Sequence, residues 1–184
     1  TFLFLVGVSL CLSYDRVVQA GWRTQRILQK FVRRGLLIFG CGLLVTIGTF
    51  VWIPDWYVRF GVLHFIGLAT ILSFPFLMKR NLALPAGVVA ILMGFLIPII
   101  DPHPPTEAFL WLGIRPLGFA TIDLFPIFPW WGIILLGIGL QDKITWPEGL
   151  PRIPWIEYIG KNALKIYLIH QPIILLLLYF VSLV

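Results

Sequence analysis

The chain of 184 residues is strongly apolar: 59% of its residues are hydrophobic, only 12% are charged, and its mean hydropathy is +0.95. Soluble domains carry about a quarter charged residues, so this composition excludes an ordinary soluble globular protein. The formal net charge is +6. Because no nucleic-acid-binding motif accompanies it, we assign this charge to contact with anionic lipid head groups and expect no nucleic-acid partner.

The first apolar stretch, residues 1–14, would be about 21 Å long as a helix, which is shorter than a hydrocarbon core of about 30 Å. We therefore expect residues upstream of this sequence to complete that helix. Five further stretches are long enough for a bilayer, at 35–53, 59–78, 82–100, 124–140 and 163–183. The fourth of these is short, and we expect it to begin earlier.

These stretches predict an all-α fold, a polytopic bundle of about six transmembrane segments. No internal repeat, low-complexity region or linker divides the chain. We therefore expect residues 1–184 to form a single transmembrane domain, the C-terminal portion of a larger one. A homo-oligomer is compatible with such a domain.

Positive charge is concentrated in three connections and their flanks, at 15–34, 79–81 and 141–162. These hold twelve of the fourteen Lys and Arg residues, and only Arg59 and Arg115 fall outside them. Because short cytoplasmic loops retain Lys and Arg, the three connections are predicted to be cytoplasmic. The C-terminus is then predicted to lie outside.

His64 and His170 lie inside otherwise apolar segments, where an ionisable residue is costly and is a functional candidate by default. His64 is five residues past Arg59 near the expected outer boundary. If both act, Arg59 orients a substrate and His64 transfers a proton. The alternative is structural: Arg59 forms an ion pair and His64 bonds a neighbouring helix.

The expected partners of Arg59 are the acidic residues near the same boundary, Asp55, Asp101 and Asp123. We assign Asp123 to substrate binding. The loop that contains Asp101 and Asp123 is long, Pro-rich and aromatic, which is typical of a lid or a binding surface. His103 in this loop is expected to be an exposed residue rather than a metal ligand, and no spacing in the chain predicts a metal site.

In the last segment, Pro172 removes a backbone donor and crowds the carbonyl of Leu168, so a kink is expected where His170 and Gln171 project. Such a kink is tolerated inside protein or beside water. We assign His170 and Gln171 to substrate binding in the inner half of the membrane; the alternative is a kink sealed by neighbouring polar groups.

The basic stretch 16–34 has two interpretations. It is either the ordinary positive-inside signal or the mouth of a site for a phosphate-rich donor such as coenzyme A. In the second case Arg33 and Arg34 would hold the donor phosphates.

Five segments in order carry a resemblance to a known family. They are TFLFLVGVSLCLSY, FVRRGLLIFGCGLLVT, WYVRFGVLHFIGLA, DLFPIFPWWGIILLGIGL and IGKNALKIYLIHQPI. Together they resemble the bacterial and archaeal relatives of heparan-alpha-glucosaminide N-acetyltransferase, over nearly the whole chain. Family members normally begin with a further helix, and the region just after that helix carries the catalytic histidine of the animal enzyme. The resemblance therefore does not transfer that role to His64 or His170.

The resemblance implies an integral membrane acyltransferase. It would move an acetyl group from cytoplasmic acetyl-CoA, a co-substrate rather than a bound cofactor, to the amine or hydroxyl of a sugar or glycan. The expected location is a bacterial or archaeal cytoplasmic membrane. Two other classes stay open from the sequence: a multi-helix transporter or carrier, and a non-catalytic membrane subunit.

Overall fold

The computed structural model describes residues 2–100, 106–144 and 153–182; for 100, 171, 172 and 174–182 it describes the backbone alone. The described residues form α-helices and short 3-10 turns, with one isolated bridge between Phe60 and Leu124 in place of any strand. The chain divides into two compact units, Thr1–Ile144 and Thr145–Val184. The expectation of an all-α membrane bundle is confirmed.

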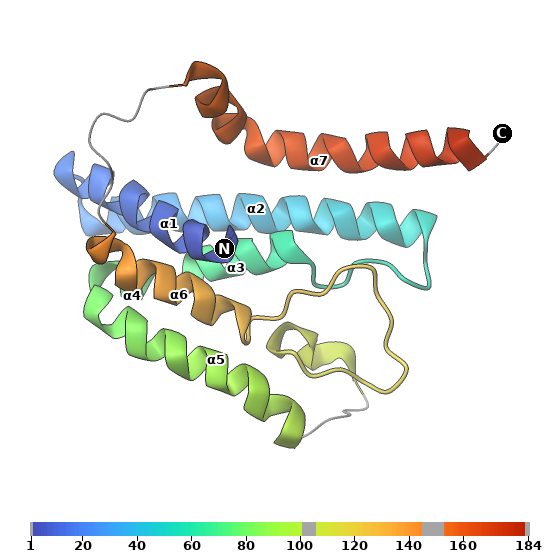
Figure 1. Ribbon diagram of the computed structural model, residues 1–184, viewed down its shortest axis with the longest axis horizontal. Helices are drawn as coiled ribbons and strands as arrows, with labels where there is room; N and C mark the ends of the chain where they lie inside the picture. Colours follow the sequence, from blue (N-terminus) through green and yellow to red (C-terminus); the bar gives the residue numbers. More distant parts are fainter. Residues whose placement is uncertain (1, 101–105, 145–152, 183–184) are drawn as a thin grey trace. The chain divides into compact units, whose positions relative to one another are not determined.

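The first unit contains six α-helices among its described residues (Figure 1). They are α1 (Phe2–Gln19), α2 (Thr24–Trp52), α3 (Val62–Leu72), α4 (Phe74–Met78), α5 (Ala83–Ile100) and α6 (Trp130–Leu140). By length and composition, three described segments can cross a membrane: Phe2–Gln19, Thr24–Trp52 and Arg80–Ile99.

Three helix boundaries differ from the sequence-based expectation. The second helix begins at Thr24 rather than at residue 35, because the Gln, Arg, Lys and Leu residues of the basic stretch are good helix formers. The segment expected at 59–78 is interrupted at Ser73, where Pro75 disrupts the regular ladder of backbone hydrogen bonds. The helix expected from residue 124 or earlier begins only at Trp130, after Pro126 and Pro129.

Glycines allow the helices of the first unit to approach closely. A Cβ on Gly7 would lie 2.1 Å from the carbonyl oxygen of Ile134, which packs α1 on α6. A Cβ on Gly132 would lie 2.6 Å from the carbonyl oxygen of Gly87, which packs α6 on α5. The remaining close pair is α2 on α3, where a Cβ on Gly35 would lie 2.7 Å from the Gly67 oxygen.

An aromatic cluster links these helix pairs in the core. Tyr14 of α1 makes edge contacts with Phe31 of α2 and Phe74 of α4, and Phe31 also contacts Phe74. Phe31 and Phe74 are 1% and 7% exposed, so their apolar surface is almost fully removed from solvent. Trp131 of α6 donates a hydrogen bond to buried Ser73 (3.0 Å), which supplies a polar partner at the break between α3 and α4.

One end of the first unit is closed by Arg80. Its guanidinium pairs with Asp15 at the end of α1 and, at 2.7 Å, with Asp142 beyond α6; it also donates a hydrogen bond to Gln141 (3.0 Å). Within the first unit, residues from all three connections predicted to be cytoplasmic therefore meet at one end. The connections 53–61 and 106–129 contact each other through other residues, described below.

The second unit contains α7 (Pro154–Ser182), which continues through Pro172. Its first turns are exposed and polar on one side: Lys161 pairs with Glu157 at 2.7 Å, and Asn162 donates to the carbonyl of Tyr158. The hydrogen bond from Lys161 lowers the pKa of Glu157. These residues precede the apolar part of the helix, in keeping with an interfacial position.

Candidate functional site

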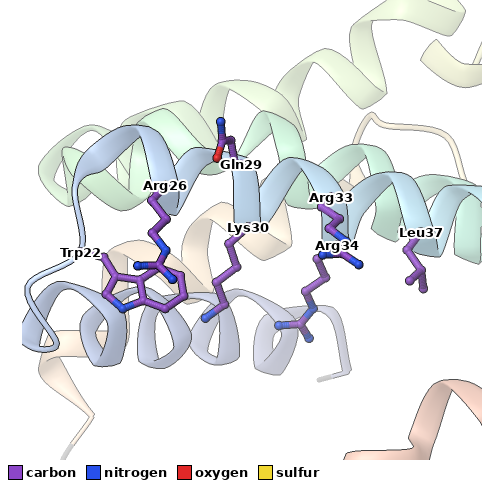
Figure 2. A pocket seen from close by; sticks show the side chains of 7 residues that line it. All are labelled: Trp22, Arg26, Gln29, Lys30, Arg33, Arg34 and Leu37. Atoms are coloured by element: carbon purple, nitrogen blue, oxygen red, sulfur yellow. The ribbon is translucent and has the colours of Figure 1, made fainter.

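A basic pocket lies on the first half of α2 and has a volume of about 560 Å³. Its lining residues recur at helical spacing along one stripe: Trp22, Arg26, Gln29, Lys30, Arg33, Arg34 and Leu37. In Figure 2, Trp22, Arg26, Lys30 and Arg34 point to the same side of α2. The predicted pair Arg33 and Arg34 is thus part of a larger set.

The cations of the basic pocket have no carboxylate partner among the described residues, whose ion pairs involve Arg59, Arg80 and Lys161. The guanidinium of Arg26 instead stacks on the ring of Trp22 at 4.2 Å. Lys30 donates a hydrogen bond to Ser13 of α1 (3.3 Å). Four uncompensated positive charges on one hollow surface favour a ligand with several negative charges.

Trp22, Arg26 and Lys30 were not singled out from the sequence. The signal was present, because residues 22, 26, 30, 33 and 37 recur every three or four positions and therefore share one face of a helix. The two interpretations of the basic stretch named only Arg33 and Arg34 for a ligand, although the same helical face also carries Trp22, Arg26 and Lys30.

A second pocket, of about 360 Å³, lies where the loops 53–61 and 106–128 meet the second half of α2. We call it the outer pocket, after the side predicted for it. It is lined by Thr46, Tyr57, Arg59, Phe60, Glu107, Leu110 and Trp111. Apolar and aromatic walls with a few polar groups are typical of small-molecule sites.

The walls of the outer pocket are held by backbone pairing between its two loops. Ile122 donates to the carbonyl of Trp56 (3.0 Å), and Phe125 donates to that of Phe60 (2.9 Å). The hydroxyl of Thr121 adds a bond to the carbonyl of Tyr57 (2.8 Å). The segment that contains Arg59 is therefore extended rather than helical, unlike the segment expected from residue 59.

Arg59 is held on several sides in the outer pocket. Its Nε lies 2.6 Å from Oε2 of Glu107, a charge contact rather than a well-aligned hydrogen bond. One terminal nitrogen donates to the carbonyl of Ala120 (3.1 Å), and the guanidinium lies 4.1 Å from the Tyr57 ring centroid. The sequence expectation of an aspartate partner was wrong for the described residues, because Glu107 is the residue that the loop pairing brings to Arg59.

Asp123 caps α3. Its Oδ2 accepts a hydrogen bond from the backbone N–H of Val62 (2.9 Å), and a carboxylate at a helix N-terminus is also favoured by the helix dipole. Asp123 lines neither pocket. Asp101 and His103, which were also considered from the sequence, lie outside the described residues.

His64 is only 2% exposed and does not line the outer pocket. Its Nδ1 accepts a hydrogen bond from the backbone N–H of Gly61 (3.3 Å), and its Nε2 lies 3.4 Å from the hydroxyl oxygen of Thr46. The ring is flanked by Phe39 and Phe60, with centroids 5.0 and 5.7 Å away. Thr46 and Phe60 both line the outer pocket and contact His64, and Thr46 is the one that does so through a polar group.

His170 belongs to the second unit and is half-buried. Its Nδ1 lies 2.5 Å from the carbonyl oxygen of Tyr167, one turn earlier on α7. The side chain of Gln171 is outside the described part of the chain. The two units are described separately, so these residues are not assigned to either pocket.

The two pockets are at opposite ends of α2 and on different faces. Arg34 and Thr46 are separated by twelve residues, or about 18 Å along a helix. Lys30 and Thr46 are about 160° apart around its axis. Gly35 and Gly42 face α3, whereas Arg33 and Arg34 are exposed. Within the first unit, the basic pocket and the outer pocket are therefore separate sites.

No group of three or more His, Cys, Asp and Glu residues that could hold a metal ion occurs among the described residues. The polar groups of the two pockets are instead suited to an anionic ligand at one end and a small polar ligand at the other. This arrangement allows group transfer or transport, and it does not by itself choose between them.

Comparison with known proteins decides the class. No curated protein and no solved structure gives a significant match to the chain. The family described as heparan-alpha-glucosaminide N-acetyltransferase, catalytic, matches residues 1–172. That range includes all of the first unit, with both pockets, and most of α7. The chain belongs to the heparan-alpha-glucosaminide N-acetyltransferase catalytic family, a family of membrane acetyltransferases.

Proposed function

We propose that this protein transfers an acetyl group from cytoplasmic acetyl-CoA to an amine or hydroxyl of a sugar on the other side of the membrane. Its location would be a bacterial or archaeal cytoplasmic membrane, and residues 1–184 would be the C-terminal portion of one larger transmembrane domain. The observation that carries the proposal is the basic pocket, because its four uncompensated cations fit the phosphates of coenzyme A.

In this proposal Arg33 and Arg34 bind the donor phosphates, with Arg26 and Lys30 beside them. All four line the same pocket. Their positive electrostatic potentials therefore add within this pocket, where a phosphate group would bind. The end of α2 that carries them is adjacent to the end closed by Arg80, which is the end predicted to be cytoplasmic. The donor would therefore enter from the compartment that contains it.

The outer pocket is proposed to bind the acceptor. Arg59, fixed by Glu107, would orient a sugar whose apolar faces pack on Tyr57 and Trp111. Asp123 would act indirectly, since its carboxylate holds the start of α3 and α3 carries His64.

A chemical step needs the thioester and the acceptor to meet, although the two pockets are about 18 Å apart along α2. The long pantetheine arm of coenzyme A separates its phosphates from its thioester, which suits such a spacing. Because the pockets are on different faces of α2, the arm must also pass around this helix. We propose that His170 and Gln171 bind substrate in the inner half of the membrane.

The test is binding of coenzyme A to the full-length protein in detergent by isothermal titration calorimetry. The Arg33→Gln, Arg34→Gln double variant should raise Kd by about tenfold or more, because each charge-assisted hydrogen bond contributes about 1.5–3 kcal/mol. 3′-Dephospho-CoA should also bind more weakly than coenzyme A. Lys79→Gln is the matched control, since Lys79 is exposed and outside the pocket.

Unchanged binding by the double variant would place the donor elsewhere. No binding of coenzyme A by the folded wild-type protein would contradict the acetyl-CoA donor itself and would favour a carrier.

A further inference from the structure

We infer that the outer pocket holds its acceptor through the hydroxyl of Thr46, which donates a hydrogen bond to a sugar hydroxyl oxygen, and that His64 is a positioning residue that orients Thr46. The inference rests on the acceptor site proposed above and deepens it. It gives Thr46 a function in acceptor binding and limits His64 to positioning, in place of proton transfer.

The position of Thr46 is the first argument. It is a residue of α2 that lines the outer pocket, whereas His64 does not line it. Thr46 therefore borders the pocket and is also bonded to His64, with its hydroxyl oxygen 3.4 Å from Nε2. Of the two polar side chains, Thr46 is the one that a ligand in the pocket can contact.

The direction of the hydrogen bonds is the second argument. The backbone N–H of Gly61 donates to Nδ1 of His64, so Nδ1 must carry a lone pair. A neutral imidazole then carries its single proton on Nε2, and Nε2–H donates to the Thr46 hydroxyl oxygen. Because the Thr46 oxygen accepts this bond, its own proton is not used toward His64 and can be donated to a ligand.

The same geometry argues against His64 as a base for Thr46 or for a ligand. A base would need a free lone pair on Nε2, and that requires moving the proton to Nδ1, where it would face the N–H of Gly61. No other bond of the Thr46 hydroxyl occurs among the described residues, so its donor capacity is available to a ligand.

Packing holds the imidazole in this orientation. Phe39 meets the ring edge-on, with centroids 5.0 Å apart. A Cβ on Gly42 would lie 2.9 Å from Nδ1, so the ring fills the space that this glycine leaves. A ring confined by Phe39 and α2 keeps its Nε2 beside the Thr46 hydroxyl, and a pre-oriented donor loses less entropy on binding.

The other groups of the pocket indicate the chemical class of ligand. Arg59 and Glu107, its two charged lining residues, are paired with each other, so the pocket offers little net charge. Tyr57 and Trp111 supply aromatic surface. One oriented hydroxyl, one ion pair and aromatic walls together suit a neutral polyhydroxylated ligand, as an unionised sugar acceptor is.

The experiment combines imidazole NMR with kinetics on the full-length protein. In protein labelled with ¹⁵N-histidine, the His64 signals are assigned by their absence from the spectrum of the His64→Gln variant. Neutral His64 should carry its proton on Nε2. Glucosamine, at a pH above the pKa of its amine so that it is neutral, should shift the Nε2 resonance, and Thr46→Val should abolish that shift. Thr70→Val is the matched control, because the Thr70 hydroxyl bonds to the carbonyl of Ile66 on its own helix (2.7 Å).

In acetyl transfer from acetyl-CoA to glucosamine, Thr46→Val should raise the acceptor KM by about tenfold, the effect of one unmade hydrogen bond. Its kcat and its Kd for coenzyme A should stay near the wild-type values. Thr46→Ser should restore the acceptor KM, because it keeps the hydroxyl.

Three results would overturn the inference: a proton on Nδ1 of neutral His64, a glucosamine shift that survives Thr46→Val, or no glucosamine shift in the wild type. An acceptor KM that Thr46→Val leaves unchanged would do the same. A wild-type protein that shows the expected NMR shifts but transfers no acetyl group would contradict the proposed function and would support sugar binding through Thr46.

Discussion

At the scale of single residues, the structure separates side chains that serve the packing from those that face a ligand. His64 is buried and fixed by Gly61, Phe39 and Gly42. Thr46 and Arg59, in contrast, line a pocket. A titratable residue in an apolar segment, such as His64, is a functional candidate. Here Thr46, which lies beside His64 and lines the pocket, is the residue that can contact a ligand.

Gly42 and Gly40 provide a matched pair that tests this packing. Gly42→Ala places a Cβ 2.9 Å from the imidazole, whereas nothing lies within 4 Å of a Cβ on Gly40. Overpacking of a tight interface costs about 1–3 kcal/mol, so Gly42→Ala should lower Tm in detergent. Gly40→Ala should leave Tm unchanged or raise it, since Ala is the better helix former. Equal effects of the two changes would contradict the packing of α2 on α3.

At the scale of helices, the ends of the first unit are held by different kinds of contact. Arg80 joins the ends of α1, α5 and α6 through side-chain charges. The loops 53–61 and 106–128 are joined largely by backbone hydrogen bonds. Replacing one charged side chain removes a charge contact. Backbone hydrogen bonds between two loops persist when a single side chain is replaced, because they do not depend on that side chain.

The Arg80 contacts predict an order of effects on stability. Arg80→Gln should lower the free energy of unfolding most, because it leaves Asp15 and Asp142 without their partner. Asp15→Asn should lower it less. Asp142→Asn should cost least, about 0–1 kcal/mol, since Asp142 has a side-chain exposure of 63% and solvent screens its charge. Thermal unfolding in detergent would measure the order, with Lys79→Gln as the control for loss of one exposed charge. A Tm for Arg80→Gln equal to that of the control would show that the contacts do not stabilise this end.

At the scale of the whole molecule, the chain is a membrane protein whose family transfers acetyl groups. In the first unit, residues of the three basic connections meet at the end closed by Arg80, and the loops around Arg59 contact each other. This grouping is the one that the charge distribution predicts for two sides of a membrane.

Sidedness can be tested by thiol labelling in intact cells with a membrane-impermeant reagent. The background is a variant in which every cysteine of the full-length protein, Cys11 and Cys41 included, is replaced by Ala. Leu117→Cys, at a position 76% exposed, should label in intact cells. Lys79→Cys should label only after the membrane is opened. Labelling of both positions from the same side would contradict the six-segment topology.

The sequence alone predicted the helical membrane fold and the family of this protein. Long apolar stretches require helices in a bilayer, because backbone groups there must be satisfied internally, and the all-α membrane fold and the family are confirmed. The residues that line the basic pocket can also be recognised in the sequence between 22 and 37. They recur every three or four positions, and residues with this spacing share one face of a helix.

The contacts of the polar side chains became known only from the tertiary structure. Among the described residues, Arg59 pairs with Glu107 rather than with Asp55 or Asp123, and Thr46 rather than His64 lines the outer pocket. These outcomes depend on loop pairing between residues about sixty positions apart, which no local pattern encodes. Hydrophobicity and periodicity act along the chain and can be read from it, whereas the contacts of a polar side chain depend on segments that folding brings together.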